Sequence, residues 1–424
     1  MRTLVLIGVG LLIVTNGCAQ PVLDYVNAPD ESFAWEVTSE ETVGQTTVTH
    51  LQVTSQTWRG IVWTHRVQMI VPEGMAHPET ALLLITGGSP GREELTFLGM
   101  AALAVSAPMV VLGDIPNQPL FGDLSEDALI SYTFAEFLQS GEADWPLLFP
   151  MTKATVRAMD AVEEYTAQAW ETPVSRWLAT GASKRGWTTW FTGAVVPDRL
   201  VGIAPMVYDN LDLPAQMAHQ IEAWGDYSVM IHDYTERGLP DLLASEEGRR
   251  LGAMVDPYTL RERITMPKLT ITGTNDPYWP LDAANLYWDG LVGPKYILYV
   301  PNSGHGLDDL MRVISAQIGF FLCASGRAPL PEPTWQFEEG GYLKLTVSTG
   351  PGAIRVTQWT AHTDTRDFRE ATWEEEPAIE QDGAWIARTL YPEAGHSALF
   401  AEIVYEVDGR EFPLSTNVRI VGAR

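Results

Sequence analysis

The chain has 424 residues, of which 46% are hydrophobic and 19% are charged. These proportions are those of a folded protein with a substantial core, and they exclude an intrinsically disordered chain. The formal net charge of −27 repels phosphate backbones and anionic membrane surfaces, so we expect no nucleic-acid partner. We interpret the acidity chiefly as a source of solubility, with attraction of a cationic substrate as the alternative.

The chain opens with a short segment typical of export. Arg2 precedes an apolar run from Leu4 to Val14, which is too short for a membrane-spanning helix of about 20 residues. We therefore interpret residues 1–19 as a signal peptide. Cleavage after Ala19 and lipid anchoring at Cys18 are the two alternatives, and both predict a secreted, periplasmic or cell-envelope protein. Without Cys18 no disulfide is expected, and Cys323 is predicted to be a small buried apolar residue.

Residues 20–328 predict an α/β domain. Residues 33–71 are rich in Val, Thr, Trp and Ile with partial alternation, which indicates a few antiparallel strands. Short apolar runs then alternate with helical patterns, as expected for a mostly parallel sheet with helices on both faces. The predicted buried strands are 81–86, 108–113, 176–180, 200–207, 267–272 and 296–300, and the predicted helices are 94–107, 153–170, 307–323 and one beginning just after Ser183.

Two inserts and a C-terminal region complete the predicted organisation. The inserts at residues 114–150 and 209–262 follow strand ends, where loops of such sheets commonly build the substrate pocket. Pro329, Pro331 and Pro333 then indicate a stiff linker. Short alternating strands with Gly-rich turns make residues 329–424 a predicted β-sandwich of the immunoglobulin or fibronectin type III kind.

The strongest chemical signal is a serine between a strand and a helix. Gly181, Ala182 and Gly186 surround Ser183, and small residues are what a sharp strand-to-helix turn requires around an exposed nucleophile. Arg185 stands where the usual G-x-S-x-G pattern has its second glycine, so the motif departs from the common form. A serine that merely caps the helix is the structural alternative.

Two further residues follow later strands in the order Ser, Asp, His. Asp276 comes after the strand at 267–272, and His305 follows the strand at 296–300 between two glycines. This order and these loop positions are those of the α/β-hydrolase fold. Ser183 is predicted as nucleophile, His305 as base, and Asp276 as the residue that holds the imidazole tautomer. Asp209 and Asp308 are the rival carboxylates.

The remaining site predictions concern the oxyanion and the substrate. The backbone N–H of Lys184 and the loop carrying Gly87 and Gly88 are predicted to stabilise the tetrahedral intermediate. The positive charges of Lys184 and Arg185 stabilise the oxyanion, bind a substrate carboxylate or form internal ion pairs, and these three alternatives stay open. We place Trp187 and, on the aromatic insert, Glu222, Trp224 and Tyr227 at the substrate pocket, with a solvated helix face as the alternative for Glu222 and Asp226. No metal and no organic cofactor is predicted.

Several segments of the chain match one known family: Thr180–Trp190, Asp256–Tyr258, Met266–Lys268, Asn275–Asp276, Tyr287–Gly290, Pro301–His305 and Arg366–Arg369. On these segments the chain resembles the PhoPQ-activated pathogenicity-related protein family, a branch of the α/β-hydrolase superfamily. The resemblance implies an exported or surface-associated protein with a fold similar to prolyl-oligopeptidase-like peptidases, and within this family Arg185 is the usual residue. A weaker resemblance links Lys184 to the basic residue that follows the serine of glucuronoyl esterases.

Together these features predict a monomeric serine hydrolase that cleaves an ester or peptide bond of a small-molecule or peptide substrate through an acyl-enzyme. Aminopeptidase or dipeptidyl-peptidase activity and glucuronoyl-esterase activity are the alternative enzyme hypotheses. The alternative of another class is a non-enzymatic secreted binding or signalling protein on a hydrolase scaffold, because fold does not fix function.

Overall fold

The computed structural model describes residues 20–423. The predicted signal peptide and the predicted lipidation of Cys18 fall on residues 1–19, outside this range. Within it, no helix has both the length and the apolar character that crossing a bilayer demands. Cys323 is 2% exposed, which confirms the prediction of a buried thiol.

The described chain contains a 14-stranded sheet whose order runs β1-β2-β3-β5-β4-β6-β7-β8-β9 before it continues into the C-terminal region. The first three strands are antiparallel, and the strands from β5 to β9 pair in parallel. Their bounds are β1 (Ala34–Val43), β2 (Thr46–Trp58), β3 (Ile61–Pro72), β4 (Thr80–Ile85), β5 (Met109–Leu112), β6 (Arg176–Ala182), β7 (Leu200–Met206), β8 (Lys268–Gly273) and β9 (Lys295–Val300).

Helices cover both faces of the parallel strands. On β4, Leu83 and Ile85 pack into one core with α4 and α5, whereas Leu82 packs into the other with α2 and α10. Alternate side chains of a strand point to opposite faces, so the continuous apolar runs are explained by burial on both sides. The helices are α1 (Pro21–Asn27), α2 (Arg92–Val105), α4 (Leu148–Ala169), α5 (Lys184–Val195) and α10 (Leu310–Ala324).

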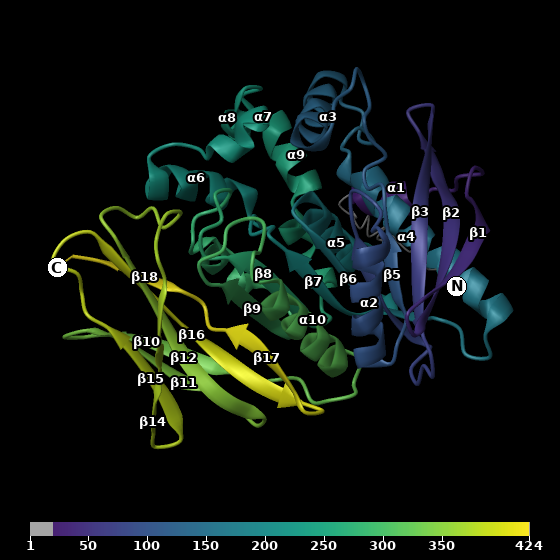
Figure 1. Cartoon of the computed structure of the whole chain (residues 1–424). Coiled ribbons are helices and arrows are strands. Elements are labelled where there is room, and N and C mark those ends of the chain that lie inside the picture. The colour runs from purple at the N-terminus through teal and green to yellow at the C-terminus, as the bar shows by residue number, and fades with distance from the viewer. Residues whose placement is uncertain (1–19, 424) are drawn as a thin grey trace, which may run out of the picture.

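Both inserts lie beyond the carboxyl ends of the parallel strands and gather at the top of the molecule in Figure 1. The first carries α3 (Glu126–Ser140), and the second carries α6 (Leu213–Trp224), α7 (His232–Thr235), α8 (Leu239–Leu242) and α9 (Glu246–Val255). The short 3-10 helices are Pro197–Arg199, Val229–Ile231, Pro257–Arg263, Ala283–Leu286 and Trp288–Gly290.

The C-terminal region consists of two packed antiparallel layers. One is a four-stranded sheet in the order β10-β11-β15-β14, and Leu345 of β11 shares a core with Ile403 of β16 in the other layer. The second layer is not a separate sheet, since Ser415 of β17 pairs with Ile297 of β9 and continues the large sheet. The strands are β10 (Thr334–Glu339), β11 (Leu343–Ser348), β12 (Ala353–Thr363), β13 (Glu374–Pro377), β14 (Ile379–Gln381), β15 (Ala384–Thr389), β16 (His396–Val407), β17 (Arg410–Ser415) and β18 (Arg419–Gly422).

This topology, with a serine between β6 and α5 and the helical inserts over the strand ends, is the α/β-hydrolase fold, carrying an additional C-terminal antiparallel layer. The predicted fold class is confirmed.

Candidate active site

Ser183 occupies the sharp turn between β6 and α5. Its φ of 57° and ψ of −124° lie in a region that non-glycine residues rarely adopt, and its N–H donates to the carbonyl of Met206 at 2.9 Å. A Cβ atom on Gly181 would lie 2.8 Å from the carbonyl oxygen of Arg185, and one on Gly186 would lie 2.7 Å from that of Met206. The close approach at position 186 explains why a glycine stands there, one residue later than the second glycine of the common motif.

His305 and Asp276 form a hydrogen-bonded pair on the loops that follow β9 and β8. His305 Nδ1 lies 2.9 Å from Asp276 Oδ2 and 3.1 Å from Oδ1. Asp276 is 4% exposed and accepts a further bond from the N–H of Tyr278 at 2.8 Å. Within the described residues the buried Nε2 of His305 has no hydrogen-bond partner. Asp276 therefore orients the imidazole through Nδ1, and Nε2 is available to accept a proton.

The rival carboxylates have other partners. Asp209 is 1% exposed and accepts a bond from the hydroxyl of Tyr287 at 2.6 Å. Burial raises the pKa of Asp209 to about 7, against the lowering effect of that bond. Asp308 pairs with Ser303, whose hydroxyl accepts from the Asp308 N–H at 2.7 Å, and so closes a local turn.

Both cations beside the nucleophile are paired internally. Lys184 is 8% exposed, and its Nζ lies 2.8 Å from Glu126 Oε2 and 3.3 Å from Asp127 Oδ2. Arg185 donates to both oxygens of Glu126 at 2.9 and 2.7 Å. Burial works to raise the pKa of Glu126, but the hydrogen bonds and charges of Arg185 and Lys184 lower it to about 2. Of the interpretations of these cations, the contacts favour internal ion pairing.

The same cluster fixes the loop predicted to stabilise the oxyanion. Arg185 Nε donates to the carbonyl of Ile115 at 2.6 Å, and a Cβ atom on Gly87 would lie 2.2 Å from Arg185 Nη2. The loop carrying Gly87 and Gly88 therefore lies beside the start of α5, where first-turn N–H groups such as that of Lys184 have no partner within the helix. The oxyanion roles of Lys184, Gly87 and Gly88 stay predictions.

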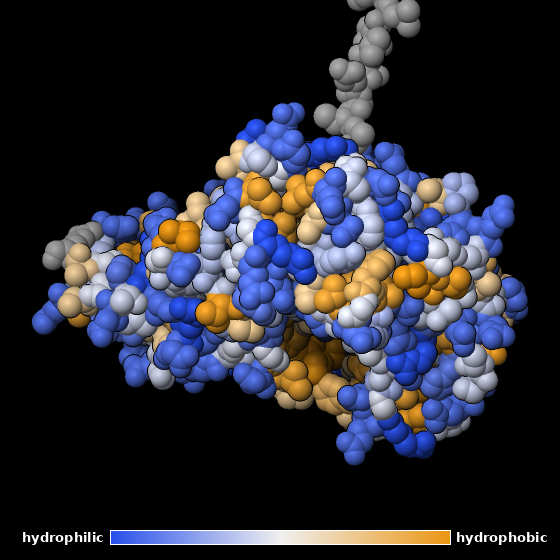
Figure 2. Space-filling view, turned by 90° about the horizontal axis from the view of Figure 1, so that it is seen from above, coloured by the Kyte–Doolittle hydropathy of each residue, from blue (hydrophilic) through white to orange (hydrophobic). Residues whose placement is uncertain are grey.

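A cavity of about 800 Å³, including its open mouth, has Ser183 and Lys184 in its wall. The rest of the wall is mainly apolar and comes largely from α5, both inserts and the loop after β8, with Phe134, Trp187, Leu213, Leu251 and Trp279 among its residues. Figure 2 looks onto this end of the molecule and shows hydrophobic side chains gathered between hydrophilic ones, including in a hollow. The predicted pocket residue Trp187 stacks on Tyr208 with ring centres 4.9 Å apart.

The three insert residues predicted at the pocket are engaged elsewhere and are not among the cavity-wall residues. Glu222 Oε1 lies 3.2 Å from Arg366 Nη1. Trp224 lies beneath the guanidinium of Arg369, 4.2 Å from its ring centre. Tyr227 packs on the small cluster that contains Trp279. Their role in substrate binding stays a prediction, because none of the three lines the cavity itself.

Sequence reasoning missed several polar residues of the site. Glu126 and Asp127 begin α3, and the ring of Tyr278 lies against that of His305 with ring centres 4.2 Å apart and a tilt of 33° between the rings. Glu126 has a φ of 54°, and no feature of the sequence predicts this left-handed backbone. Tyr278, by contrast, lies two residues after Asp276, and this position could have predicted that it belongs to the site. Among residues 20–423 no group of three His, Cys, Asp or Glu side chains is arranged to hold a metal ion.

Comparisons with known proteins agree with this architecture. A family model described as PhoPQ-activated pathogenicity-related protein matches residues 22–369. The autocrine proliferation repressor protein A of Dictyostelium discoideum is 33% identical over 440 aligned positions, covering 93% of this chain and 88% of that protein.

Solved structures resemble the chain more distantly. Acetyl xylan esterase 1 from Thermoanaerobacterium sp. JW/SL YS485 is 17% identical with a TM-score of 0.49, covering 72% of this chain and 91% of that one. A glucuronoyl esterase from Solibacter usitatus is 14% identical with a TM-score of 0.42, over 72% and 91% of the two chains. Likeness at this level carries no information on activity. The extent of the family match and of the Dictyostelium alignment settles the family: the chain belongs to the PhoPQ-activated pathogenicity-related proteins.

Proposed function

We propose that the chain is a serine hydrolase that cleaves ester or amide bonds whose acyl or leaving group is neutral and apolar. The observation that carries the proposal is the state of His305, whose Nδ1 is bonded to buried Asp276 while its Nε2 has no partner in the described residues. A base needs this arrangement to accept the proton of a serine hydroxyl.

The mechanism follows from the roles of the three residues. Ser183 Oγ attacks the carbonyl carbon as His305 Nε2 takes its proton, which gives a tetrahedral oxyanion. The negative charge of Asp276 stabilises the imidazolium formed in this step. The imidazolium then protonates the leaving alcohol or amine, and the acyl group stays on Ser183. Water, deprotonated by His305, attacks the acyl carbon and forms a second tetrahedral oxyanion. Collapse of this oxyanion breaks the bond to Ser183 Oγ, which takes the proton back from His305 as the carboxylic acid is released.

The cavity wall supports the neutral, apolar character of the substrate. Its charged residues Lys184 and Asp127 contact each other at 3.3 Å, and Glu126 supplies a second carboxylate to Lys184. A free substrate carboxylate would have to displace these partners, which disfavours recognition of a uronic acid by Lys184. The acids Glu222 and Asp226, considered for an amino terminus, do not line the cavity, so we favour an esterase over an aminopeptidase.

Fluorophosphonate labelling of the purified protein tests the nucleophile, with Ser183→Ala as the control. We expect labelling that is lost in the variant. A series of p-nitrophenyl esters from acetate to octanoate then tests the cavity. Each added methylene that enters it contributes about 0.8 kcal/mol, or roughly fourfold in kcat/KM, until the cavity is full.

The variant Leu251→Trp tests whether this cavity is the one used. It should reduce hydrolysis of the long esters while leaving the acetate unchanged. Well-folded protein that neither takes the label nor hydrolyses any ester would favour the second candidate, a non-enzymatic signalling protein. We retain this candidate because the Dictyostelium relative is named a proliferation repressor.

A further inference from the structure

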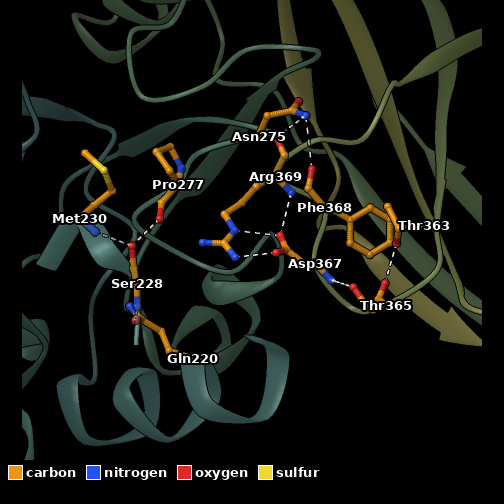
Figure 3. A network of polar contacts seen from close by, with 10 residues as sticks. All are labelled: Gln220, Ser228, Met230, Asn275, Pro277, Thr363, Thr365, Asp367, Phe368 and Arg369. Atoms are coloured by element: carbon orange, nitrogen blue, oxygen red, sulfur yellow. Dashed lines mark hydrogen bonds and ion pairs between the residues drawn. The ribbon is translucent and has the colours of Figure 1, made fainter. Parts of the chain in front are cut away.

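A loop of the C-terminal region reaches both loops that carry the predicted acid and base. This loop, residues 364–373, connects β12 to β13, and we call it the strap. Asn275, directly before Asp276, points its Nδ2 at three strap carbonyls, those of Phe368, Arg369 and Ala371, at 3.3, 3.1 and 2.7 Å. Figure 3 shows the Asn275 side chain turned towards Phe368 and Arg369. An amide has only two N–H donors, so the three carbonyls share them around the short bond to Ala371.

The base loop is attached to the other end of the strap. Asn302, three residues before His305, donates from Nδ2 to the carbonyl of Trp373 at 3.0 Å and accepts from its N–H at 2.7 Å. Thr274 links the two loops, because its hydroxyl donates to Asn275 Oδ1 at 2.7 Å and accepts from the Asn302 N–H at 2.9 Å. One hydrogen-bonded network therefore joins the acid loop, the base loop and the strap.

The strap also has rigid support of its own. Phe368 and Trp373 are 2% and 3% exposed. Asp367 accepts bonds from both the N–H and the Nε of Arg369, at 3.0 and 2.9 Å, as Figure 3 shows. Buried aromatic anchors and a closed ion pair fix the backbone carbonyls to which Asn275 and Asn302 are bonded.

The second insert holds the acid loop from the other side. Ser228 Oγ donates to the carbonyl of Pro277 at 2.6 Å, and Gln220 Nε2 donates to that of Tyr278 at 3.0 Å. Arg366 of the strap spans the two sides, with Nη2 at 2.6 Å from Asp282 Oδ2 and Nη1 at 3.2 Å from Glu222 of α6. Asp276 thus sits between a residue anchored to the strap and residues anchored to the insert.

We propose that the strap is a positioning element for the triad, and that Asn275 and Asn302 are the positioning residues through which the C-terminal region fixes Asp276 against His305. The inference rests on the proposed function. It gives the C-terminal region a role in turnover, beyond simple attachment to the sheet. Because a displacement of about 1 Å can reduce a rate about 100-fold, releasing either loop should slow the reaction without weakening substrate binding.

The test compares Asn275→Ala and Asn302→Ala with the matched control Asn285→Ala. Asn285 also bridges to the C-terminal region, donating to the carbonyl of Val418 at 2.9 Å, but it lies in the 3-10 helix Ala283–Leu286, away from Asp276 along the chain. With turnover counted per fluorophosphonate-labelled serine, we expect kcat to fall about 10- to 100-fold in the first two variants, with KM within about twofold. The control should keep its kcat although it loses comparable stability.

Equal losses of stability with unchanged kcat in all three variants would overturn the proposal and leave the strap a structural attachment. If the two alanine variants do not fold, Arg366→Ala decides, since the Arg366 side chain is 31% exposed and its partner Asp282 keeps a second partner in His219, at 2.7 Å. A lowered kcat at constant KM supports positioning, and an unchanged kcat refutes it. Failure of the proposed function gives a different result, because the unaltered protein would then not label at all.

Discussion

Asp209 offers a quantitative test of the electrostatics behind the site. Its carboxyl is fully buried and bonded to Tyr287, and burial raises its pKa to about 7 from the ordinary 3.8, with the nearby charge of Asp276 adding to the increase. That difference corresponds to about 4 kcal/mol in the free energy of unfolding. Substitution by asparagine removes the titration while keeping an oxygen that accepts the tyrosine hydroxyl.

The direction of the effect follows from proton linkage. Because the pKa of Asp209 is higher in the folded state, its stabilising contribution is fully present below pH 3.8 and is lost as the pH rises through about 7. At pH 8 the folded protein therefore carries the cost of a buried carboxylate, which Asp209→Asn relieves. Relative to the unaltered protein, the variant should gain up to about 4 kcal/mol between pH 4 and pH 8.

Urea unfolding of both proteins at the two pH values measures this gain, and the comparison cancels the pH dependence of all other groups. A difference in stability that is the same at pH 4 and pH 8 would refute the reasoning. Activity separates the rival carboxylates in the same experiment. Asp209→Asn should retain kcat/KM within a few-fold, whereas Asp276→Asn, which loses the tautomer control of His305, should lose about 10⁴-fold.

Two further predictions concern the ion-pair cluster. Glu126→Gln should lower the free energy of unfolding by about 1–2 kcal/mol in urea titrations, a value discounted for the partial exposure of Glu126. The pKa of Glu126 is about 2 in the folded state, compared with an ordinary value of 4.5. The loss of stability in the variant should therefore persist above pH 4.5 and vanish as the pH falls towards 2. Gly87→Ala places a Cβ atom 2.2 Å from Arg185 Nη2, and kcat should fall by an amount approaching the 10²–10³-fold typical of a lost oxyanion donor. Gly88→Ala, whose Cβ would meet nothing within 4 Å, should be milder, and equal effects of the two would contradict the packing argument.

The sheet could be predicted from the sequence because its signal is local. Runs such as Leu200–Met206 are apolar throughout, and burial on both faces is what such runs require. The order of Ser183, Asp276 and His305 along the chain was also readable, since each follows its own strand. These signals depend on neighbouring residues alone.

The features of the site that could not be predicted depend on contacts between residues far apart in the chain. Glu126 meets Lys184 and Arg185 across 58 and 59 positions, and no periodicity encodes such a meeting. The insert aromatics Trp224 and Tyr227 were predicted at the pocket from composition, but composition does not say which side of α6 faces the serine. In the sequence, the strap is recognisable only as Arg366–Arg369, one of the segments that resemble the family. Its contacts to Asn275 could not be predicted, because backbone carbonyls rather than side chains make them.

The pairing of β17 with β9 bears on the tendency of the protein to aggregate. At Ser415 and Ile297 the C-terminal layer occupies the hydrogen-bonding edge of the last parallel strand, and the hydroxyl of Ser415 accepts the N–H of Tyr299 at 3.0 Å. An uncovered edge of this kind recruits strands from other molecules. A chain shortened to end at Ala328 would expose β9, so we expect it to self-associate and precipitate. We therefore expect the C-terminal strands to suppress aggregation by covering this edge.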